Sequence, residues 1–205
     1  MGNRGTESGI RPFSLSEGMN MAALADDQGK TELVVLLDDE LVPVGAAPKA
    51  TVHTADTPLH LAFSCYVFGP DGRVLLTRRA IGKKTWPGVW TNSFCGHPAP
   101  GEREEDAVMR RARQELGLAI TDPHVVLPDF RYSAVDASGV RENEFCPVWT
   151  ATADSDPVPE PGEVCEWRWL DWADLVDAIE RTPFVFSPWA QLQVPRLDSA
   201  RSRVA

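Results

Sequence analysis

The sequence has 205 residues, of which 43% are hydrophobic and 24% charged, a composition typical of globular proteins rather than fibrous or disordered ones. The length suits one compact domain with a hydrophobic core and is too short for two domains of ordinary size. With 20 Lys and Arg against 30 Asp and Glu, the formal charge is -10, which argues against binding of nucleic acid or acidic membranes through bulk charge.

Residues 1–30 contain much Gly, Ser, Asn and charge without periodicity, so we expect a flexible N-terminal extension there. The longest apolar run of this extension, residues 21–25, is too short for a signal-peptide core. No run in the chain approaches the roughly 20 apolar residues that cross a bilayer. The four cysteines are widely spaced without a CxxC pair, which favours reduced thiols in a cytoplasmic protein.

Short apolar runs in the N-terminal half predict β-strands. The first two runs flank an acidic turn and read as a small hairpin, and the sequence GPDG at residues 69–72 is a turn signal between the third and fourth runs. The predicted strands are residues 33–37, 41–44, 61–68, 74–78 and 90–95.

The C-terminal half mixes helices and strands. Residues 104–116 open with acidic residues, repeat apolar residues at helical spacing and are followed by Gly117, which predicts a helix. Residues 145–152 and 166–170 predict strands on either side of a Pro-rich acidic loop at 154–163, and Asp171 is a candidate cap for a helix to about Glu180. Strands and helices in this order predict the α/β (α+β) class, with a mixed β-sheet sandwiched between helices.

The segment from Gly96 to Leu118 resembles the Nudix box, a loop–helix–loop motif of the form G-x5-E-x7-R-E-x2-E-E-x-G-U, where U is aliphatic. The matching residues are Gly96, Glu102, Arg110, Glu115, Gly117 and Leu118. Two positions depart from the motif, because Arg111 and Gln114 stand where the box has glutamates. The loss of two carboxylates and the gain of a cation favour holding a diphosphate over hydrolysing one.

Further blocks between about residues 49 and 189 are similar, in the same order, to the type 1 isopentenyl-diphosphate isomerases, a branch of the Nudix superfamily. These blocks are residues 53–57, 59–63, 77–80, 83–93, 95–98, 129–132, 142–144 and 186–189. The resemblance implies a single Nudix-like catalytic domain over residues 31–195 and a C-terminal tail over 196–205. It also implies an enzyme of isoprenoid biosynthesis that interconverts isopentenyl diphosphate and dimethylallyl diphosphate.

Three of the four histidines lie in these blocks, near a pair of glutamates. If residues 142–144 are extended, Glu142 and Glu144 project from one face. Imidazoles with carboxylates suit a borderline divalent metal such as Zn²⁺ or Mn²⁺, although histidines in general more often lie on the surface or in a satisfied core. The resemblance identifies this metal site as His53, His60, His97, Glu142 and Glu144.

The resemblance also assigns the substrate site. It implies that Lys49, Arg79, Lys83 and Arg111 hold the diphosphate and that Glu115 binds the Mg²⁺ that accompanies it. Arg111 and Glu115 are four residues apart on the predicted helix and so share a face. Each cation taken alone could equally be a solvated surface charge.

Isomerisation moves a double bond, so it needs one group that adds a proton and another that removes one. The resemblance implies that Cys95 and Glu144 are these groups, that Tyr132 helps to deliver the proton near Glu144, and that Trp189 stabilises the carbocation through its π face. A free cysteine is otherwise a small buried hydrophobe, and we expect this of Cys65, Cys146 and Cys165.

Two rival interpretations remain from the sequence. One is a Nudix hydrolase of a nucleoside or other diphosphate, and the other is a binding module that keeps the fold without catalysis. The expected partner is a small isoprenoid diphosphate, with no nucleic acid, membrane, nucleotide or flavin, and the expected state is a monomer.

Overall fold

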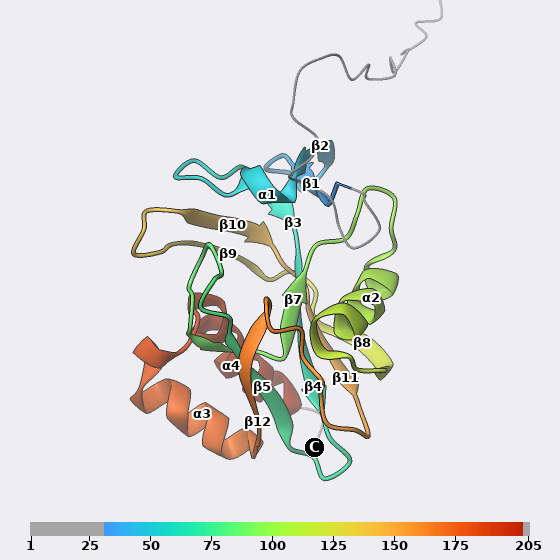
Figure 1. Cartoon of the computed structure of the whole chain (residues 1–205), viewed down its shortest axis with the longest axis vertical. Coiled ribbons are helices and arrows are strands. Elements are labelled where there is room, and N and C mark those ends of the chain that lie inside the picture. The colour runs from blue at the N-terminus through green and yellow to red at the C-terminus, as the bar shows by residue number, and fades with distance from the viewer. Residues whose placement is uncertain (1–30, 203–205) are drawn as a thin grey trace, which may run out of the picture.

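The computed structural model describes residues 31–202 (Figure 1), so the extension expected over residues 1–30 lies outside the described residues. The strands are β1 (Leu33–Leu37), β2 (Pro43–Pro48), β3 (His60–Leu61), β4 (Phe63–Phe68), β5 (Val74–Arg79), β6 (Trp90–Thr91), β7 (Phe94–Gly96), β8 (Thr121–Leu127), β9 (Arg131–Val135), β10 (Arg141–Phe145), β11 (Val148–Thr152) and β12 (Val164–Leu170). The helices are α1 (Lys49–Val52), α2 (Glu104–Leu116), α3 (Trp172–Arg181) and α4 (Pro188–Arg201), with a 3₁₀ turn η2 (Pro183–Val185) before α4.

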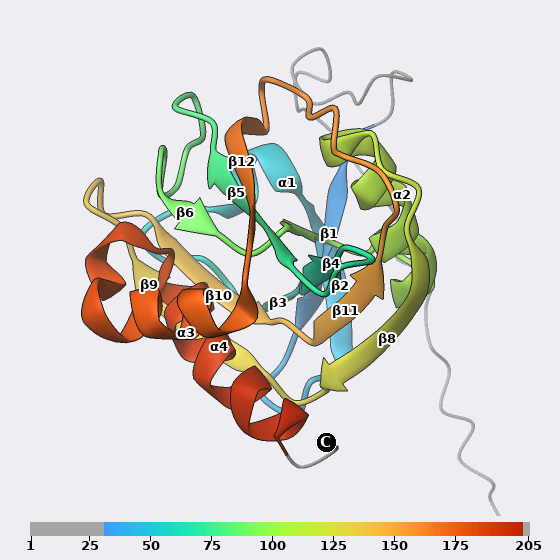
Figure 2. The same cartoon turned by 90° about the horizontal axis from the view of Figure 1, so that it is seen from below.

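The strands form two sheets. A seven-stranded sheet has the order β12-β5-β4-β11-β8, with β6 beside β5 and β7 beside β4, and a five-stranded sheet has the order β2-β1-β3-β10-β9. The larger sheet is mixed, because β11 runs parallel to β4 while β5 and β8 pair antiparallel. Helix α2 lies on one side of it and α3 and α4 on the other (Figures 1 and 2). The predicted mixed sheet between helices is confirmed, and the smaller sheet is an addition to it.

Strand β4 is the centre of the core. All six of its residues are buried, and successive side chains point to opposite faces. Phe63 and Val67 pack in the cluster that includes α2, whereas Tyr66 and Phe68 pack in the cluster that includes α3 and α4. Burial on both faces explains why this stretch has a continuous apolar sequence rather than an alternating one.

Two predicted strands are each divided where the chain passes from one sheet to the other. The run 61–68 is interrupted at Ala62, between β3 in the smaller sheet and β4 in the larger. The run 145–152 is interrupted at 146–147, where Pro147 cannot donate a ladder hydrogen bond. Because β3 pairs in parallel with β10 and β4 with β11, the two crossings lie side by side and place His60 opposite Glu144.

The predicted strand 90–95 is also divided, into β6 on β5 and β7 on β4. Ser93 bridges β4 and β5 at this point, because its Oγ accepts from Val67 N at 2.7 Å and donates to Leu75 O at 2.6 Å. A side chain thus takes over hydrogen bonding where the backbone ladder stops.

The remaining predictions differ in detail. The helix 104–116 is confirmed as α2, and Gly117 follows it with a φ of 63°. Asp171 occupies the N-cap position of α3 without a side-chain cap hydrogen bond. Helix α4 runs through the expected boundary at residue 195 to Arg201, and Leu197 within this stretch is 1% exposed.

Helix α4 escaped the pattern analysis because Pro195 lies inside it and its apolar residues lack helical periodicity. Strands β8 and β9 were also missed. β8 contains a proline and is mostly exposed or half-buried, so no buried face marks it in the sequence. No helix within residues 31–202 is long and apolar enough to span a membrane.

Candidate active site

A cavity of about 690 Å³ is lined by residues from both sheets, α2 and α4. Every site residue predicted from the sequence lines it except His60, which is fully buried. The residues brought together are Lys49, His53, Arg79, Lys83, Cys95, His97, Arg111, Glu115, Tyr132, Glu142, Glu144 and Trp189. Because these residues span most of the chain, the fold assembles the cavity from distant segments.

Strand β10 presents the two glutamates. Its burial alternates, with Glu142 and Glu144 each 6% exposed. Asn143 points away from them, and its Nδ2 donates to Thr57 O at 3.2 Å. Pairing with β9 sets Glu144 opposite Tyr132. The expectation that the two glutamates share a face is confirmed.

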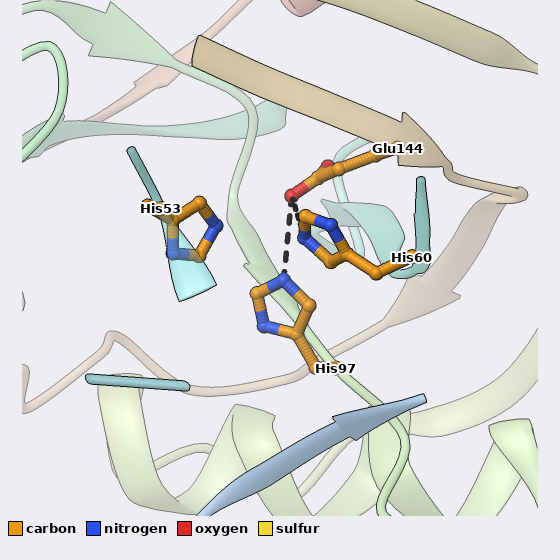
Figure 3. A group of neighbouring side chains, drawn as sticks. All are labelled: His53, His60, His97 and Glu144. Atoms are coloured by element: carbon orange, nitrogen blue, oxygen red, sulfur yellow. Dashed lines mark hydrogen bonds and ion pairs between the residues drawn. The ribbon is translucent and has the colours of Figure 1, made fainter. Parts of the chain in front are cut away.

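Three histidines converge on Glu144 (Figure 3). The ligand atoms of His53, His60, His97 and Glu144 all lie within 4.8 Å of one another. Glu144 Oε1 is 3.3 Å from His97 Nε2 and 3.6 Å from His60 Nε2. Glu142 lies outside this four-residue group, but its Oε2 is 3.1 Å from His53 Nε2.

The donor atoms of this cluster fit a divalent cation. His60 Nδ1 is 2.9 Å from Pro58 O, a contact in which Nδ1 must carry the proton, so His60 Nε2 is left with a free lone pair. Four buried polar atoms of the cluster have no hydrogen-bond partner, namely His53 Nε2, His60 Nε2, His97 Nδ1 and Glu142 Oε2. Buried polar atoms normally have partners, and a borderline divalent metal with N and O ligands would satisfy three of these atoms.

The electrostatics of the cluster also favour a cation. Burial lowers the pKa of His97 to about 3, so its imidazole is neutral. Burial alone would raise the pKa of Glu144, but the neighbouring imidazoles of His60 and His97 outweigh it and hold that pKa well below its usual range. Glu144 is therefore a buried carboxylate, and a divalent cation would balance its charge.

Cys95 lies on β7 with its thiol in the cavity wall. Its Sγ is 3.3 Å from Asn92 Oδ1 and 3.4 Å from Ser64 Oγ. Burial raises the pKa of this thiol to about 12, so Cys95 carries its proton at neutral pH. Cys65 and Cys146 are buried as expected, whereas the expectation for Cys165 was wrong, because this residue is exposed near the edge of the larger sheet.

Aromatic rings form the wall near Cys95. The Trp189 ring lies 5.7 Å from the rings of both Tyr132 and Trp86, and Trp189 is 2% exposed. The Arg79 guanidinium lies 5.3 Å from the Trp189 ring centroid. Within the described residues the Tyr132 hydroxyl makes no hydrogen bond, so it is available to a ligand in the cavity.

The predicted diphosphate cations are each held by a protein acceptor. Lys49 Nζ is 2.7 Å from Glu32 Oε2, Lys83 forms an ion pair with Glu163, and Arg111 Nε donates to Glu115 Oε1 at 3.0 Å. Arg79 Nη2 instead donates to Thr85 O at 2.8 Å. Burial lowers the pKa of Lys83 to about 8 and also lowers the pKa of Lys49. Partly desolvated cations of this kind favour the binding of an anion.

Sequence reasoning missed several residues of this cavity. Glu32 and Glu163 pair with the cations, Thr85 donates to Glu142, and Asn92, outside the cavity lining, contacts Cys95. Glu163 ends a loop whose composition indicates only a loop, so no pattern marks it. Glu102 of the Nudix-like motif lies outside the cavity lining, where it accepts from Arg110 at 2.7 and 2.8 Å.

Comparisons with known proteins agree with this architecture. Residues 58–190 match the NUDIX domain family. A relative from Clavibacter michiganensis subsp. michiganensis, named isopentenyl-diphosphate Delta-isomerase, is 64% identical over 167 residues, covering 82% of this chain and 86% of the relative. Relatives with the same name from Paenarthrobacter aurescens and Frankia alni are 59% and 53% identical, covering 84% and 90% of this chain and 94% and 92% of their own lengths.

Solved structures are similar in fold. DR0079 from Deinococcus radiodurans has a TM-score of 0.62 at 19% identity, covering 80% of this chain and 98% of its own. The MutT protein from Methanosarcina mazei has a TM-score of 0.59 at 16% identity, covering 71% and 97%. At such low identity these structures establish the fold alone.

Proposed function

Because this chain belongs to the NUDIX domain family and, within it, to the isopentenyl-diphosphate Delta-isomerases, we propose that it interconverts isopentenyl diphosphate and dimethylallyl diphosphate. The reaction adds a proton to the terminal carbon of the alkene. It removes a proton from the methylene that is attached to the internal alkene carbon on the diphosphate side. A tertiary carbocation lies between the two steps. The enzyme therefore needs a proton donor, a proton acceptor and a wall that excludes water.

The observation that carries this proposal is a thiol and a carboxyl group, Cys95 and Glu144, in the lining of one cavity. Cys95 carries a proton and Glu144 is a carboxylate, and both line the same space. In our proposal Cys95 gives a proton to the alkene and Glu144 accepts the one that leaves. Tyr132, opposite Glu144 on the neighbouring strand, donates a hydrogen bond near this carboxylate and assists the proton transfer there.

Trp189 supports the carbocation in this mechanism. Its buried ring lines the cavity, and a desolvated cation–π contact is worth about 2 kcal/mol or more. Trp86 and Tyr132 pack beside it, so the wall near the cation is aromatic and poor in competing nucleophiles.

The diphosphate anchors the small hydrocarbon in the proposed complex. Lys49, Arg79, Lys83 and Arg111 would hold it, with Mg²⁺ bound by Glu115 and the diphosphate oxygens. Binding energy from this remote group can position the alkene, which offers few contacts of its own. The same arrangement disfavours hydrolysis, because Arg111 and Gln114 replace two of the carboxylates that the Nudix box provides.

The residues that would hold a second metal are His53, His60, His97, Glu142 and Glu144. Bound there, Mn²⁺ or Zn²⁺ would tune the proton affinity of Glu144 without redox chemistry. Glu144 would then combine a ligand role with its role as base. We also propose that the protein is a cytoplasmic monomer without nucleic acid or membrane partners.

The test is incubation of the protein with isopentenyl diphosphate and Mg²⁺ in D₂O, with product and deuterium followed by NMR and released phosphate assayed in parallel. Dimethylallyl diphosphate carrying deuterium, without phosphate release, is the expected result. Phosphate release without isomerisation would favour the hydrolase, and tight binding without turnover would favour the binding module. Either result would overturn the roles given to Cys95 and Glu144.

A further inference from the structure

Asn92 lies between β6 and β7 and is fully buried. Its amide oxygen accepts from Trp189 Nε1 at 2.9 Å, from Cys95 Sγ at 3.3 Å and from Thr91 Oγ1 at 2.8 Å. Its amide nitrogen donates to Cys65 O at 3.1 Å and to Phe94 O at 2.6 Å. A single side chain is thus in contact with both the thiol and the indole of the proposed mechanism.

Chemistry fixes which way this amide points. The indole N–H of Trp189 can only donate, so it must face the oxygen, and the carbonyls of Cys65 and Phe94 can only accept, so they must face the nitrogen. Because the oxygen carries no hydrogen, the Cys95 contact requires the thiol to be the donor. The S–H bond of Cys95 is therefore aimed at Asn92 in the resting thiol, and it must turn from this acceptor toward the alkene when the proton is transferred.

Ser64 holds the same thiol from a second side. Its Oγ is 3.4 Å from Cys95 Sγ and accepts a hydrogen bond from Gln193 Nε2 at 2.9 Å. The Gln193 bond leaves the Ser64 proton free, and because Cys146 Sγ also lies 3.4 Å from Ser64 Oγ, this proton can be donated to either sulfur. Contacts with Asn92 on one side and Ser64 on the other restrict the rotamer of Cys95.

We propose that Asn92 is a positioning residue that sets the Cys95 thiol and the Trp189 ring at a fixed relative position through one shared amide oxygen. This inference rests on the proposed isomerase function. Protonation of the alkene places positive charge on the adjacent carbon, so the proton donor and the ring that faces the charge must be aligned on neighbouring atoms. A shared hydrogen-bond acceptor ties these two groups to each other rather than to separate parts of the fold.

The test compares Asn92→Leu with Ser93→Ala. Ser93 is the adjacent residue, is equally buried and bridges β4 and β5, but Asn92 alone of the two bonds to Cys95 and Trp189. In Asn92→Leu we expect kcat to fall by about 10²-fold, the cost of displacing a reacting group by about 1 Å. We expect KM to change by less than about threefold, because the diphosphate cations are untouched. Ser93→Ala should lower the unfolding temperature and leave kcat near the wild-type value.

Infrared spectroscopy of the S–H stretch supplies a readout that does not depend on turnover. The Cys95 band, identified by its loss in Cys95→Ser, should have the lowered frequency of a hydrogen-bonded thiol in the wild-type protein and in Ser93→Ala. It should shift toward the free-thiol frequency in Asn92→Leu, where Ser64 Oγ is the remaining hydrogen-bond partner of the thiol. If Asn92→Leu does not fold, the wild-type band alone decides, because a free-thiol frequency there would overturn the inference.

The outcomes separate this inference from the proposed function. A wild-type protein that does not isomerise refutes the function while the infrared band still reports on Asn92. An active wild type combined with an Asn92→Leu variant of unchanged kcat and unchanged S–H frequency refutes the role of Asn92 alone.

Discussion

Cys95 is the residue on which the proposed proton transfer depends most directly. Replacement by Ala removes the proton donor and leaves a smaller side chain in the middle of β7, so the fold should persist. A positioned general acid contributes about 10²–10⁴-fold to rate, and we expect isomerisation by Cys95→Ala to fall by at least the lower figure. Deuterium incorporation measured by NMR gives the rate, and circular dichroism monitors the fold.

The matched control is Cys165→Ala, because Cys165 is exposed and lies outside the cavity lining. We expect it to keep the wild-type rate. If Cys95→Ala also kept the full rate, the donor would have to be another group of the cavity.

Lys83 predicts a pH dependence of diphosphate binding. Burial, reinforced by the charges of Arg79, Lys49 and Arg111, lowers its pKa from 10.5 to about 8. Lys83 therefore loses its charge as the pH rises through about 8, and a neutral amine binds an anion weakly. We expect the affinity for inorganic diphosphate, measured by calorimetry, to fall across this range.

Lys83→Arg separates this effect from titration of the diphosphate itself. Arginine stays charged at every accessible pH, so the ratio of the two proteins' affinities should shift in favour of the variant as the pH rises from about 7 to about 9. A ratio that stays constant would show that Lys83 does not titrate in this range.

At the scale of elements, α2 depends on close contact with β7. A Cβ at Gly96 would lie 2.7 Å from both Arg111 Cγ and Phe63 Cζ. We expect Gly96→Ala to destabilise the protein by about 1–3 kcal/mol through overpacking, and to weaken diphosphate binding because Arg111 is displaced. Gly82→Ala is the control, since a Cβ there meets no atom within 4 Å. Urea unfolding gives the free energy of unfolding of both variants, and equal stabilities would contradict the prediction.

The loop between β5 and β6 connects Arg79, a proposed diphosphate ligand, to Glu142, a proposed metal ligand. Thr85 Oγ1 donates to Glu142 Oε1 at 2.7 Å, while Thr85 O accepts from Arg79 Nη2 at 2.8 Å. We expect inorganic diphosphate to bind more tightly to protein loaded with Mn²⁺ than to protein treated with a chelator. The ratio of the two affinities should shrink in Thr85→Val and recover in Thr85→Ser. Couplings between two sites typically change an affinity by about 5–150-fold. An unchanged ratio in Thr85→Val would remove Thr85 from the connection.

The elements also show what a sequence can and cannot predict. Helix α2 was predicted to the residue because its periodicity and Gly117 are local signals. The runs 61–68 and 145–152 were predicted as single strands, since the pattern within a strand does not reveal that the chain changes sheets at Ala62 and Pro147. Pairing between sheets depends on contacts distant in sequence.

The site divides in the same way. The histidines and glutamates could be predicted because the family's motifs mark them. Of the 13 predicted residues, 12 line one cavity. Glu32 and Glu163 were not predicted, because an acidic residue that pairs with a cation in the fold looks like any other acidic residue in the sequence.

At the scale of the whole molecule, the protein and its proposed diphosphate substrate are both negatively charged. The formal charge is -10, yet Lys49, Lys83 and Arg111 gather at one cavity, where carboxylates neutralise them. A local group of cations can therefore attract a diphosphate that the overall charge repels. Exchange of these carboxylate partners for the diphosphate would avoid leaving the half-buried lysines and the buried Arg111 unpaired in either state.

The proposed metal site joins four segments of the chain, so a bound metal should stabilise the whole fold. His53 follows α1, His60 lies on β3, His97 follows β7 and Glu144 lies on β10. A ligand that binds only the native state adds about 2.7 kcal/mol at 100 times its dissociation constant, which is several degrees in a domain of this size. We expect the unfolding temperature measured by calorimetry to rise with added Mn²⁺ or Zn²⁺ and to fall in EDTA.

Histidine variants tie this stabilisation to the cluster. His97→Ala removes one ligand, so we expect a lower metal content by elemental analysis after dialysis and little change of unfolding temperature on addition of metal. His124→Ala is the matched control, because His124 is exposed on β8 and contacts Thr150 and Asp122 rather than the cluster. Equal metal responses in the two variants would mean that the stabilising cation binds elsewhere. A response lost only in His97→Ala would link the junction of the two sheets, through one ion, to the stability of the entire chain.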